Sequence, residues 1–292
     1  MKKLLLNILK FFGSILPQTV PELIYTSLPR FIKKPVNALL SSSIPEYVKV
    51  GNVDVALNKQ DPVVSGALML GVYEKHELKL LQEKLKPGMN VIDLGANVGL
   101  YTALAASIVG NTGKVFAFEP DKDNFIFLQK TVTKNNFSNI ECNQIAISDH
   151  GGEGKLYFSE DNFGDHRIFD SHDNRKSYPI QLMTLDSFVS SRNIQKVDFI
   201  KMDIQGAEGF AMKGMEGVLK HNPQLQIFTE FWPQGIAATG ESPLAFLEIL
   251  KKYQFDIFEI NRTTGHLSLV TDINALTNKL HGREFANLYC KK

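Results

Sequence analysis

The stretch VIDLGANVGLYT, residues 91–102, places an aspartate at the end of an apolar run and follows it with two glycines. Gly95 and Gly99 allow the backbone to turn tightly or to approach another group closely, because neither carries a Cβ atom. Glu119 follows Gly99 by twenty residues and ends the apolar run VFAFE. A carboxylate in that place can accept the hydrogens of both hydroxyl groups of a ribose. This spacing therefore predicts a site for a cofactor that contains adenosine.

The composition of the loop favours one class of such cofactors. A dinucleotide-binding loop reads G-x-G-x-x-G and holds a pyrophosphate, whereas this loop reads G-x-N-x-G. Asp93, directly before the loop, would repel a pyrophosphate, but its charge suits a ligand that carries an ammonium and a sulfonium group. We therefore expect S-adenosylmethionine. An NAD-dependent dehydrogenase and a non-catalytic binding protein of the same fold are the alternatives.

Three side chains are candidates for a catalytic base. Methyl transfer from a sulfonium is an in-line displacement, so an acceptor hydroxyl must be aligned and must lose its proton as the bond forms. Asp203 ends the run VDFIKMD, Glu230 ends LQIFTE, and His166 lies in the polar loop NFGDHRIF with a side chain that titrates near neutral pH. Asp203 could instead cap the next helix, and His166 could be an ordinary surface histidine. We rank them Asp203, His166, Glu230, and expect no metal site.

Alternating strands and helices are predicted from residue 90 onward to position these groups. Helices are expected over residues 99–109, 122–135 and 242–253, with another that ends near Lys220. Continuous apolar strands separated by helices indicate an α/β fold with a mainly parallel sheet that is covered on both faces. Ligands of such sheets bind beyond the carboxyl ends of the strands.

The domain organisation follows from the same patterns. We expect an N-terminal helical segment over residues 1–45, a hairpin and helix lead-in over 46–84, and a catalytic domain over 85–292. A hairpin is predicted from the alternation in YVKVGNVDVALN, and a second one is predicted at GEGKLYF.

Taken in order, these motifs resemble those of the FkbM family of S-adenosylmethionine-dependent methyltransferases. The matching stretches are VIDLGANVGLYT, VFAFEPDKDNF, AISDHGGEGKLYF, TLDSF and FIKMDIQGAE, with DPVVSGALMLGVYEKHE similar to the family's lead-in; together they cover about residues 50–230. The resemblance implies a Rossmann-like, seven-stranded class I methyltransferase sheet whose last strand, FANLYCK, is antiparallel. It also implies an O-methyltransferase that acts on a hydroxyl of a sugar, a glycoconjugate or a related metabolite. A nucleic acid or a protein is the alternative acceptor.

By position in these motifs, the resemblance assigns residues to parts of the cofactor. The methionine part would be lined by Gly95, Ala96, Asn97 and Gly99. Asp93 would face its ammonium directly or through water, and Glu119 would hold the ribose. Gln144 and Ala146 fall where the adenine ring should lie. Glu74 is expected either to close over the cofactor or to be an exposed carboxylate at a helix start. The family commonly has an acidic residue in place of Gln205. Glutamine carries no charge, so this position lacks the carboxylate that could bind a metal or an amine.

The composition bears on partners and compartment. The formal net charge is +1, from 32 Lys+Arg against 31 Asp+Glu, which gives no general attraction to nucleic acid. Hydrophobic content of 43% and charged content of 22% are those of a soluble globular protein, and we expect it in the cytoplasm. Cys142 and Cys290 lie in apolar strand-like runs, in different halves of the expected sheet. They should therefore be free thiols, too far apart to form a disulfide.

The first sixteen residues are expected to form an amphipathic helix. Lys3, Asn7, Lys10 and Ser14 recur at helical spacing, and apolar residues cover the rest of the surface. The stretch is too short to span a bilayer, and no signal-peptidase site follows it. Two alternatives stay open: the helix packs on its own protein or a second copy, or it lies in a membrane surface.

Overall fold

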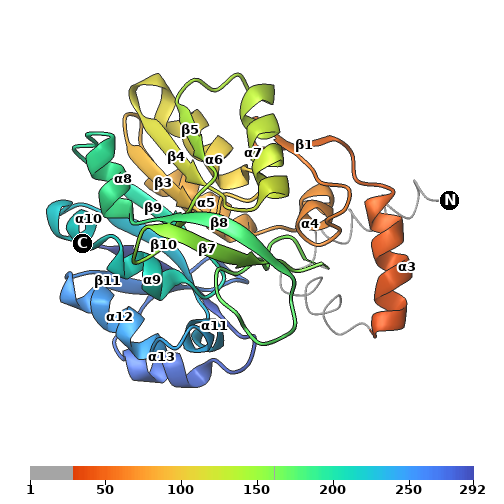
Figure 1. Ribbon diagram of the computed structural model, residues 1–292. Coiled ribbons are helices and arrows are strands. Elements are labelled where there is room, and N and C mark those ends of the chain that lie inside the picture. Colours follow the sequence, from red (N-terminus) through yellow and green to blue (C-terminus); the bar gives the residue numbers. More distant parts are fainter. Residues whose placement is uncertain (1–28, 161) are drawn as a thin grey trace.

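The computed structural model describes residues 29–160 and 162–292, so the helix expected over residues 1–16 lies outside the described residues (Figure 1). The largest sheet has eight strands, in the order β12-β11-β13-β10-β9-β3-β4-β5. Their bounds are β3 Asn90–Leu94, β4 Lys114–Phe118, β5 Ile140–Asn143, β9 Phe199–Met202, β10 Gln226–Phe231, β11 Asp256–Ile260, β12 Leu267–Leu269 and β13 Ala286–Lys291. Five neighbouring strands, β10 to β5 in this order, are parallel, and β13 is antiparallel to both β10 and β11. The α/β fold and the antiparallel last strand are therefore confirmed.

The expected strand count was one too low. After β11 the chain turns back and adds the short strand β12 at the edge of the sheet, antiparallel to β11. Only three residues form this strand, and Leu269 is 53% exposed. A strand of three residues is too short for an alternation of apolar residues to predict it.

Helices cover both faces of the sheet and form two hydrophobic cores. Successive residues of a strand point to opposite faces, so Val91 and Ile92 of β3 belong to different cores. Val91 packs in the core that contains residues of α4 (Val64–Leu70), α5 (Lys75–Lys84) and α6 (Leu100–Val109). Ile92 packs in the core that contains residues of α8, α9, α10, α12 and α13. These helices are α8 Leu185–Ser191, α9 Glu208–Lys213, α10 Glu216–His221, α12 Pro243–Lys252 and α13 Ile273–Lys279.

The predicted helices are confirmed with small changes at their ends. The helices expected over 99–109, 122–135 and 242–253 correspond to α6, α7 (Lys122–Lys134) and α12. The helix expected to end near Lys220 is divided into α9 and α10. Gly214 lies between these two helices and packs against the backbone of Ser148. An added Cβ atom at Gly214 would be 1.9 Å from the carbonyl oxygen of Ser148.

The lead-in shares a core with the sheet. The predicted hairpin at residues 47–56 is confirmed as β1 (Tyr47–Val50) and β2 (Val53–Ala56), which pair antiparallel. Two amides of β2 donate to side chains of α7: Asp54 to Asn135 Oδ1 at 2.8 Å, and Ala56 to Thr131 Oγ1 at 2.9 Å. α3 (Arg30–Ser41) precedes this hairpin, and α11 (Pro233–Ala238) follows β10.

GEGKLYF, where a second hairpin was predicted, forms an antiparallel pair, but its partner strand follows only after residues 158–176. β7 (Gly152–Tyr157) pairs antiparallel with β8 (Ser177–Met183), and the two residues of β6 (Ala146–Ile147) run parallel to β8 in a separate three-stranded sheet. β8 contains Pro179, which weakens a strand pattern in the sequence. The polar segment of residues 158–176 therefore connects two paired strands.

Both cysteines are free, as expected. Cys142 lies in the edge strand β5 and Cys290 in β13, with four strands between them. At about 4.8 Å for each step between strands, they are roughly 24 Å apart. In the part of the chain that the structure describes, no helix is both long enough and apolar enough to cross a membrane.

Candidate active site

The glycine-rich loop between β3 and α6 lies against other parts of the chain. Gly95 and Gly99 have φ angles of +78° and +86°. A Cβ atom on Gly95 would be 2.0 Å from the carbonyl oxygen of Asp203, and one on Gly99 would be 2.8 Å from Leu128 Cδ1. Both glycines are therefore required by the packing of the loop on β9 and α7, in addition to any contact with a ligand.

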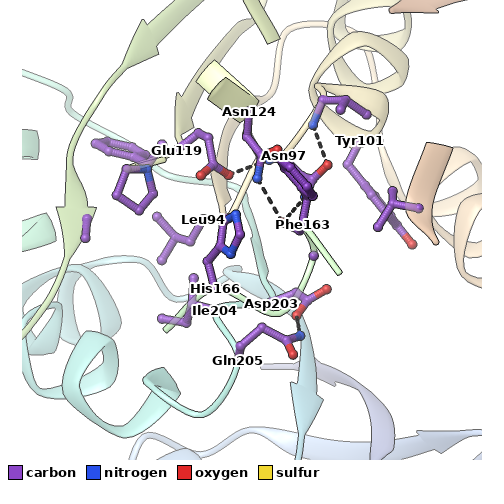
Figure 2. Close-up of a pocket in the computed structure, with 18 of the residues that line it drawn as sticks. Leu94, Asn97, Tyr101, Glu119, Asn124, Phe163, His166, Asp203, Ile204 and Gln205 are labelled. Carbon is purple, nitrogen blue, oxygen red and sulfur yellow. Dashed lines mark hydrogen bonds between the residues drawn. The ribbon is translucent and has the colours of Figure 1, made fainter. Parts of the chain in front are cut away.

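A cavity of about 870 Å³, including the space at its mouth, lies beyond the carboxyl ends of β3, β4 and β9 (Figure 2). Of the residues predicted for the site, seven line it: Gly95, Ala96, Asn97, Glu119, Ala146, His166 and Asp203. Five do not: Glu74, Asp93, Gly99, Gln144 and Glu230. The side chain of Gln144 is exposed, and the neighbouring Ile145 borders the cavity in its place. Most of the predicted residues that line the cavity thus lie at or just after strand ends. Ligands of parallel sheets bind at this edge.

Glu119 is held rigidly at one end of the cavity. Its side chain is 5% exposed, Oε2 accepts from the amide of Asn97 at 2.7 Å, and Oε1 accepts from the amide of Asp121 at 2.9 Å. Burial raises the pKa of Glu119 to about 8, although these amide hydrogen bonds act in the opposite direction. A carboxylate oxygen can accept more than one hydrogen bond, so both oxygens can still receive a hydroxyl hydrogen. The ribose assignment stays a prediction.

Asp93 lies below the loop and next to a lysine. Its Oδ2 accepts from Thr102 Oγ1 at 2.5 Å, whereas its buried Oδ1 has no hydrogen-bond partner in the described part of the chain. Lys201 Nζ lies 3.6 Å from that oxygen and donates to the carbonyl of Gly95 at 2.9 Å. Burial alone would lower the pKa of Lys201, but the surrounding carboxylates, with Asp93 first, outweigh burial and raise it. Lys201 therefore supplies a positive charge where Asp93 was expected to meet an ammonium.

Glu74 is turned into the protein. It begins α5 in the left-handed region, with φ 39° and ψ 45°, and its Oε2 accepts from the hydroxyl of Tyr101 at 2.6 Å. Tyr101 itself lines the cavity. Burial, followed by the charge of Asp203, raises the pKa of Glu74 from 4.5 to about 8. The exposed alternative for Glu74 is therefore wrong, and the carboxyl group lies one side chain away from the cavity.

This burial makes the stability of the cofactor-free protein depend on pH. The folded pKa of Glu74 is above its ordinary value, so its contribution to stability is complete below about pH 4.5 and is lost as the pH rises through about 8. The variant Glu74→Gln keeps an acceptor for Tyr101 and cannot ionise. We expect its free energy of unfolding in urea, relative to the wild type, to increase between pH 5.5 and pH 8.5.

Glu83→Gln is the matched control for this prediction. Glu83 lies on the same helix, α5, with its side chain 55% exposed and 3.8 Å from Lys79. The Glu83→Gln variant should therefore have the same pH dependence of unfolding as the wild type. A Glu74→Gln protein with the same pH dependence as the wild type would show that Glu74 is hydrated in the folded state. Glu119 titrates in the same direction, so part of the dependence should remain in Glu74→Gln.

Asp203 and Gln205 lie at the other end of the cavity (Figure 2), and Gln205 links Asp203 to Glu230. Gln205 Nε2 donates to Asp203 Oδ1 at 2.7 Å and lies 3.4 Å from Glu230 Oε1. Burial, followed by the charge of Asp203, raises the pKa of Glu230 well above its ordinary value. The raised pKa favours the protonated form of Glu230, which disfavours Glu230 as a general base.

His166 borders the cavity between these two ends, but both ring nitrogens have neighbours. Nδ1 accepts from the amide of Ser159 at 3.0 Å, and Nε2 lies 3.7 Å from Asp121 Oδ2. Burial lowers the pKa of His166, so the ring is neutral at pH 7 and carries its proton on Nε2. A base needs an unprotonated nitrogen that faces the substrate, and the Ser159 amide occupies that nitrogen.

Sequence reasoning missed three contributors to the site. Lys201 could have been found, because a lysine inside the apolar run FIKMD is unusual for a buried strand. Asn124 and Phe163 carried no comparable signal. Their importance depends on a hydrogen bond from Asn124 Nδ2 to the carbonyl of Phe163, at 2.9 Å between residues 39 positions apart.

The sequence profile described as "Methyltransferase FkbM domain" matches residues 93–257 of this chain. That match covers more than half of the chain. The chain belongs to the FkbM methyltransferase family. The resemblance of the motifs is thereby confirmed, and S-adenosylmethionine is the cofactor.

Individual relatives are more distant. Hexuronic acid methyltransferase AglP of Haloferax volcanii is 26% identical over 150 residues, which are 50% of this chain and 58% of that protein. The probable cobalt-precorrin-6B C(15)-methyltransferase of Sulfurisphaera tokodaii is 36% identical over 69 residues, 23% of this chain and 36% of that protein. The matches thus span between about a third and somewhat over half of these relatives. Among solved structures, precorrin-6y C5,15-methyltransferase from Geobacter metallireducens is 10% identical, with a TM-score of 0.42 over 82% of this chain and 94% of that one.

The residues around the cavity fit this family member's cofactor. S-Adenosylmethionine supplies a methyl group that is activated by a positively charged sulfur. Asp203 borders the cavity and Asp93 lies behind the glycine-rich loop, so two aspartates face the one lysine among these residues, Lys201. A ligand with an ammonium and a sulfonium compensates that excess, while Lys201 can face its carboxylate. The glycine loop, Glu119 and Ala146 would hold it.

Proposed function

We propose that this chain is an O-methyltransferase that modifies a hydroxyl group of a sugar, a glycoconjugate or a related metabolite. The observation that carries the proposal is the position of Asp203, which borders the cavity at the carboxyl end of β9. Gln205 holds one oxygen of its carboxylate at 2.7 Å. An aspartate held at that point can accept the proton of a hydroxyl aligned with the methyl group of the cofactor.

The neighbouring groups support this division of roles. The methyl group would leave the sulfonium of S-adenosylmethionine, releasing S-adenosylhomocysteine, as the acceptor oxygen bonds to it. The hydroxyl proton would pass to the Asp203 carboxylate and then to solvent. Glu230 does not line the cavity, and it is proposed to hold the Gln205 amide that contacts Asp203. His166 is proposed to position the acceptor or the loop around it, since its Nδ1 is occupied by the Ser159 amide.

Two further facts favour a sugar over a nucleic acid. The relative from Haloferax volcanii is named a hexuronic acid methyltransferase. The formal net charge of this chain is +1, and two acidic side chains, Glu119 and Asp203, line the cavity, which does not favour a polyanionic strand. We therefore propose a small molecule or a glycan as the partner and no nucleic acid. Contacts of residues 1–16 with a membrane or a second copy remain an expectation.

The test is to incubate the purified protein with methyl-labelled S-adenosylmethionine and separate fractions of sugars, glycans, RNA and protein. We expect label in a sugar or glycan fraction, in a linkage that resists mild base, as a methyl ether does. Label released by mild base would be a methyl ester on a carboxylate, and label in RNA or protein would show another acceptor. Either result would overturn the proposal. Asp203→Asn serves as the inactive control.

A further inference from the structure

Asn124 has a buried oxygen without a partner at the edge of the cavity. It lies in the first turn of α7, is 2% exposed, and lines the cavity. Its Nδ2 donates to the carbonyl of Phe163 at 2.9 Å, but its Oδ1 has no hydrogen-bond partner among the residues that the structure describes. A buried amide oxygen without a partner costs about 1–3 kcal/mol, so a ligand that donates to it would be favoured.

The hydrogen bond to Phe163 fixes which side-chain atom of Asn124 is left without a partner. The carbonyl of Phe163 can only accept, so the atom of Asn124 that contacts it is the nitrogen, and the oxygen is the unpaired atom. Asn97 differs in this respect. Its Nδ2 also donates to the carbonyl of Phe163, at 3.2 Å, but its Oδ1 accepts from the amide of Val98 at 2.8 Å.

Asn124 belongs to the same turn as Glu119. Glu119 Oε1 accepts from the amide of Asp121, and Asp121 Oδ1 accepts from the amide of Asn124 at 2.7 Å. Figure 2 shows Glu119, Asn97 and Asn124 together at one end of the cavity, away from Asp203 and Gln205. The unpaired oxygen thus lies at the end where the cofactor's ribose is expected.

We propose that Asn124 is a cofactor-binding residue whose Oδ1 accepts a hydrogen bond from one ribose hydroxyl of S-adenosylmethionine. Glu119 and Asn124 then divide the ribose between them, with a carboxyl group on one side and a neutral amide on the other. The same Asn124 side chain holds the segment 162–176 at the cavity through the carbonyl of Phe163, a residue that also lines the cavity. Its replacement therefore has two separable consequences, one on the segment and one on the ribose contact.

The experiment measures binding affinity by calorimetry. It combines a substitution of Asn124 in the protein with the removal of one ribose hydroxyl from the ligand. The ligands are S-adenosylhomocysteine and its 2′-deoxy and 3′-deoxy analogues, and the proteins are the wild type and Asn124→Ala. A lost contact with Phe163 weakens all three ligands equally. A lost contact with a ribose hydroxyl weakens only the ligands that carry that hydroxyl.

We expect Asn124→Ala to weaken S-adenosylhomocysteine about 2–10-fold more than it weakens one of the two deoxy analogues, which is the range of a single neutral hydrogen bond. Equal losses for all three ligands would overturn the proposal and leave Asn124 with the loop contact alone. If Asn124→Ala does not fold, Asn124→Ser enters the same comparison.

Asn139→Ala is the matched control. Asn139 is also a buried asparagine, 8% exposed, and its Nδ2 donates to the carbonyls of Ala106 and Gly110, both at 2.9 Å. It does not line the cavity. This variant should lower the thermal unfolding midpoint without distinguishing among the three ligands. Because binding is measured in the absence of an acceptor, the result does not depend on which hydroxyl is methylated.

Discussion

Asp203→Asn should reduce kcat by about 10²–10⁴-fold, the usual effect of removing a general base. Asparagine has nearly the same shape, and its oxygen can still accept from Gln205 Nε2, but it cannot take a proton. The backbone bond from the Asp203 amide to the carbonyl of Leu94 is unaffected. Affinity for S-adenosylhomocysteine, measured by calorimetry, should therefore stay within a few-fold while kcat falls.

Two variants of the other candidates complete this comparison. Glu230→Gln keeps an oxygen that can accept from Gln205 Nε2, so it should change kcat little. His166→Asn leaves an oxygen that can accept from the Ser159 amide and removes the rest of the ring from the cavity wall, so it should also change kcat little. If Asp203→Asn retains kcat within a few-fold, alignment in the cavity must supply the catalysis without a dedicated base.

The sequence identified the loop after β3 and the end of β4 because short-range patterns mark them. Asp93, the two glycines and Glu119 stand at fixed positions relative to strand ends, and strand ends follow from apolar runs. The position of the cavity then follows from the general behaviour of parallel sheets. The pattern could not show that the carbonyl oxygen of Asp203 leaves no room for a Cβ atom at position 95, because Asp203 is more than a hundred positions away in the chain.

The parts that escaped prediction depend on long-range pairing. β8 joins β7 across residues 158–176, and the Phe163 carbonyl of that segment receives the side-chain amides of Asn97 and Asn124. Asp61 also hydrogen-bonds the backbone of Phe163, although its carboxylate mainly accepts from amides at the start of α4. Neither apolar periodicity nor a local motif reports contacts of this kind, since each partner is an ordinary loop or cap residue in its own segment.

The ranking of the catalytic candidates also changed for a reason invisible in the sequence. His166 ranked above Glu230 because histidine titrates near neutral pH. In the fold its Nδ1 accepts from the Ser159 amide, and burial lowers its pKa. Glu230 is disfavoured as a base by the opposite effect, since burial and neighbouring carboxylates raise its pKa and favour its protonated form. Asp203 remains the candidate that is best placed to accept a proton.

Gly95→Ala should destabilise the protein by about 3–5 kcal/mol, because it combines a left-handed backbone with overpacking. The φ angle of Gly95 is +78°, and an added Cβ atom would be 2.0 Å from the carbonyl oxygen of Asp203. That oxygen belongs to the backbone at the end of β9, so it cannot move aside as a flexible side chain could. Unfolding in urea measures the loss, and cofactor affinity should fall with it because the loop must shift.

Gly71→Ala separates the two contributions to this loss. Gly71 ends α4 with φ 69° and ψ 31°, and an added Cβ atom there would have no neighbour within 4 Å among the described residues. Its variant therefore carries only the cost of the left-handed conformation, about 1–2 kcal/mol. The difference between the two variants is the cost of overpacking against β9. If Gly95→Ala is no less stable than Gly71→Ala and binds S-adenosylhomocysteine normally, the loop can move away from β9, and the close approach is not required for the site.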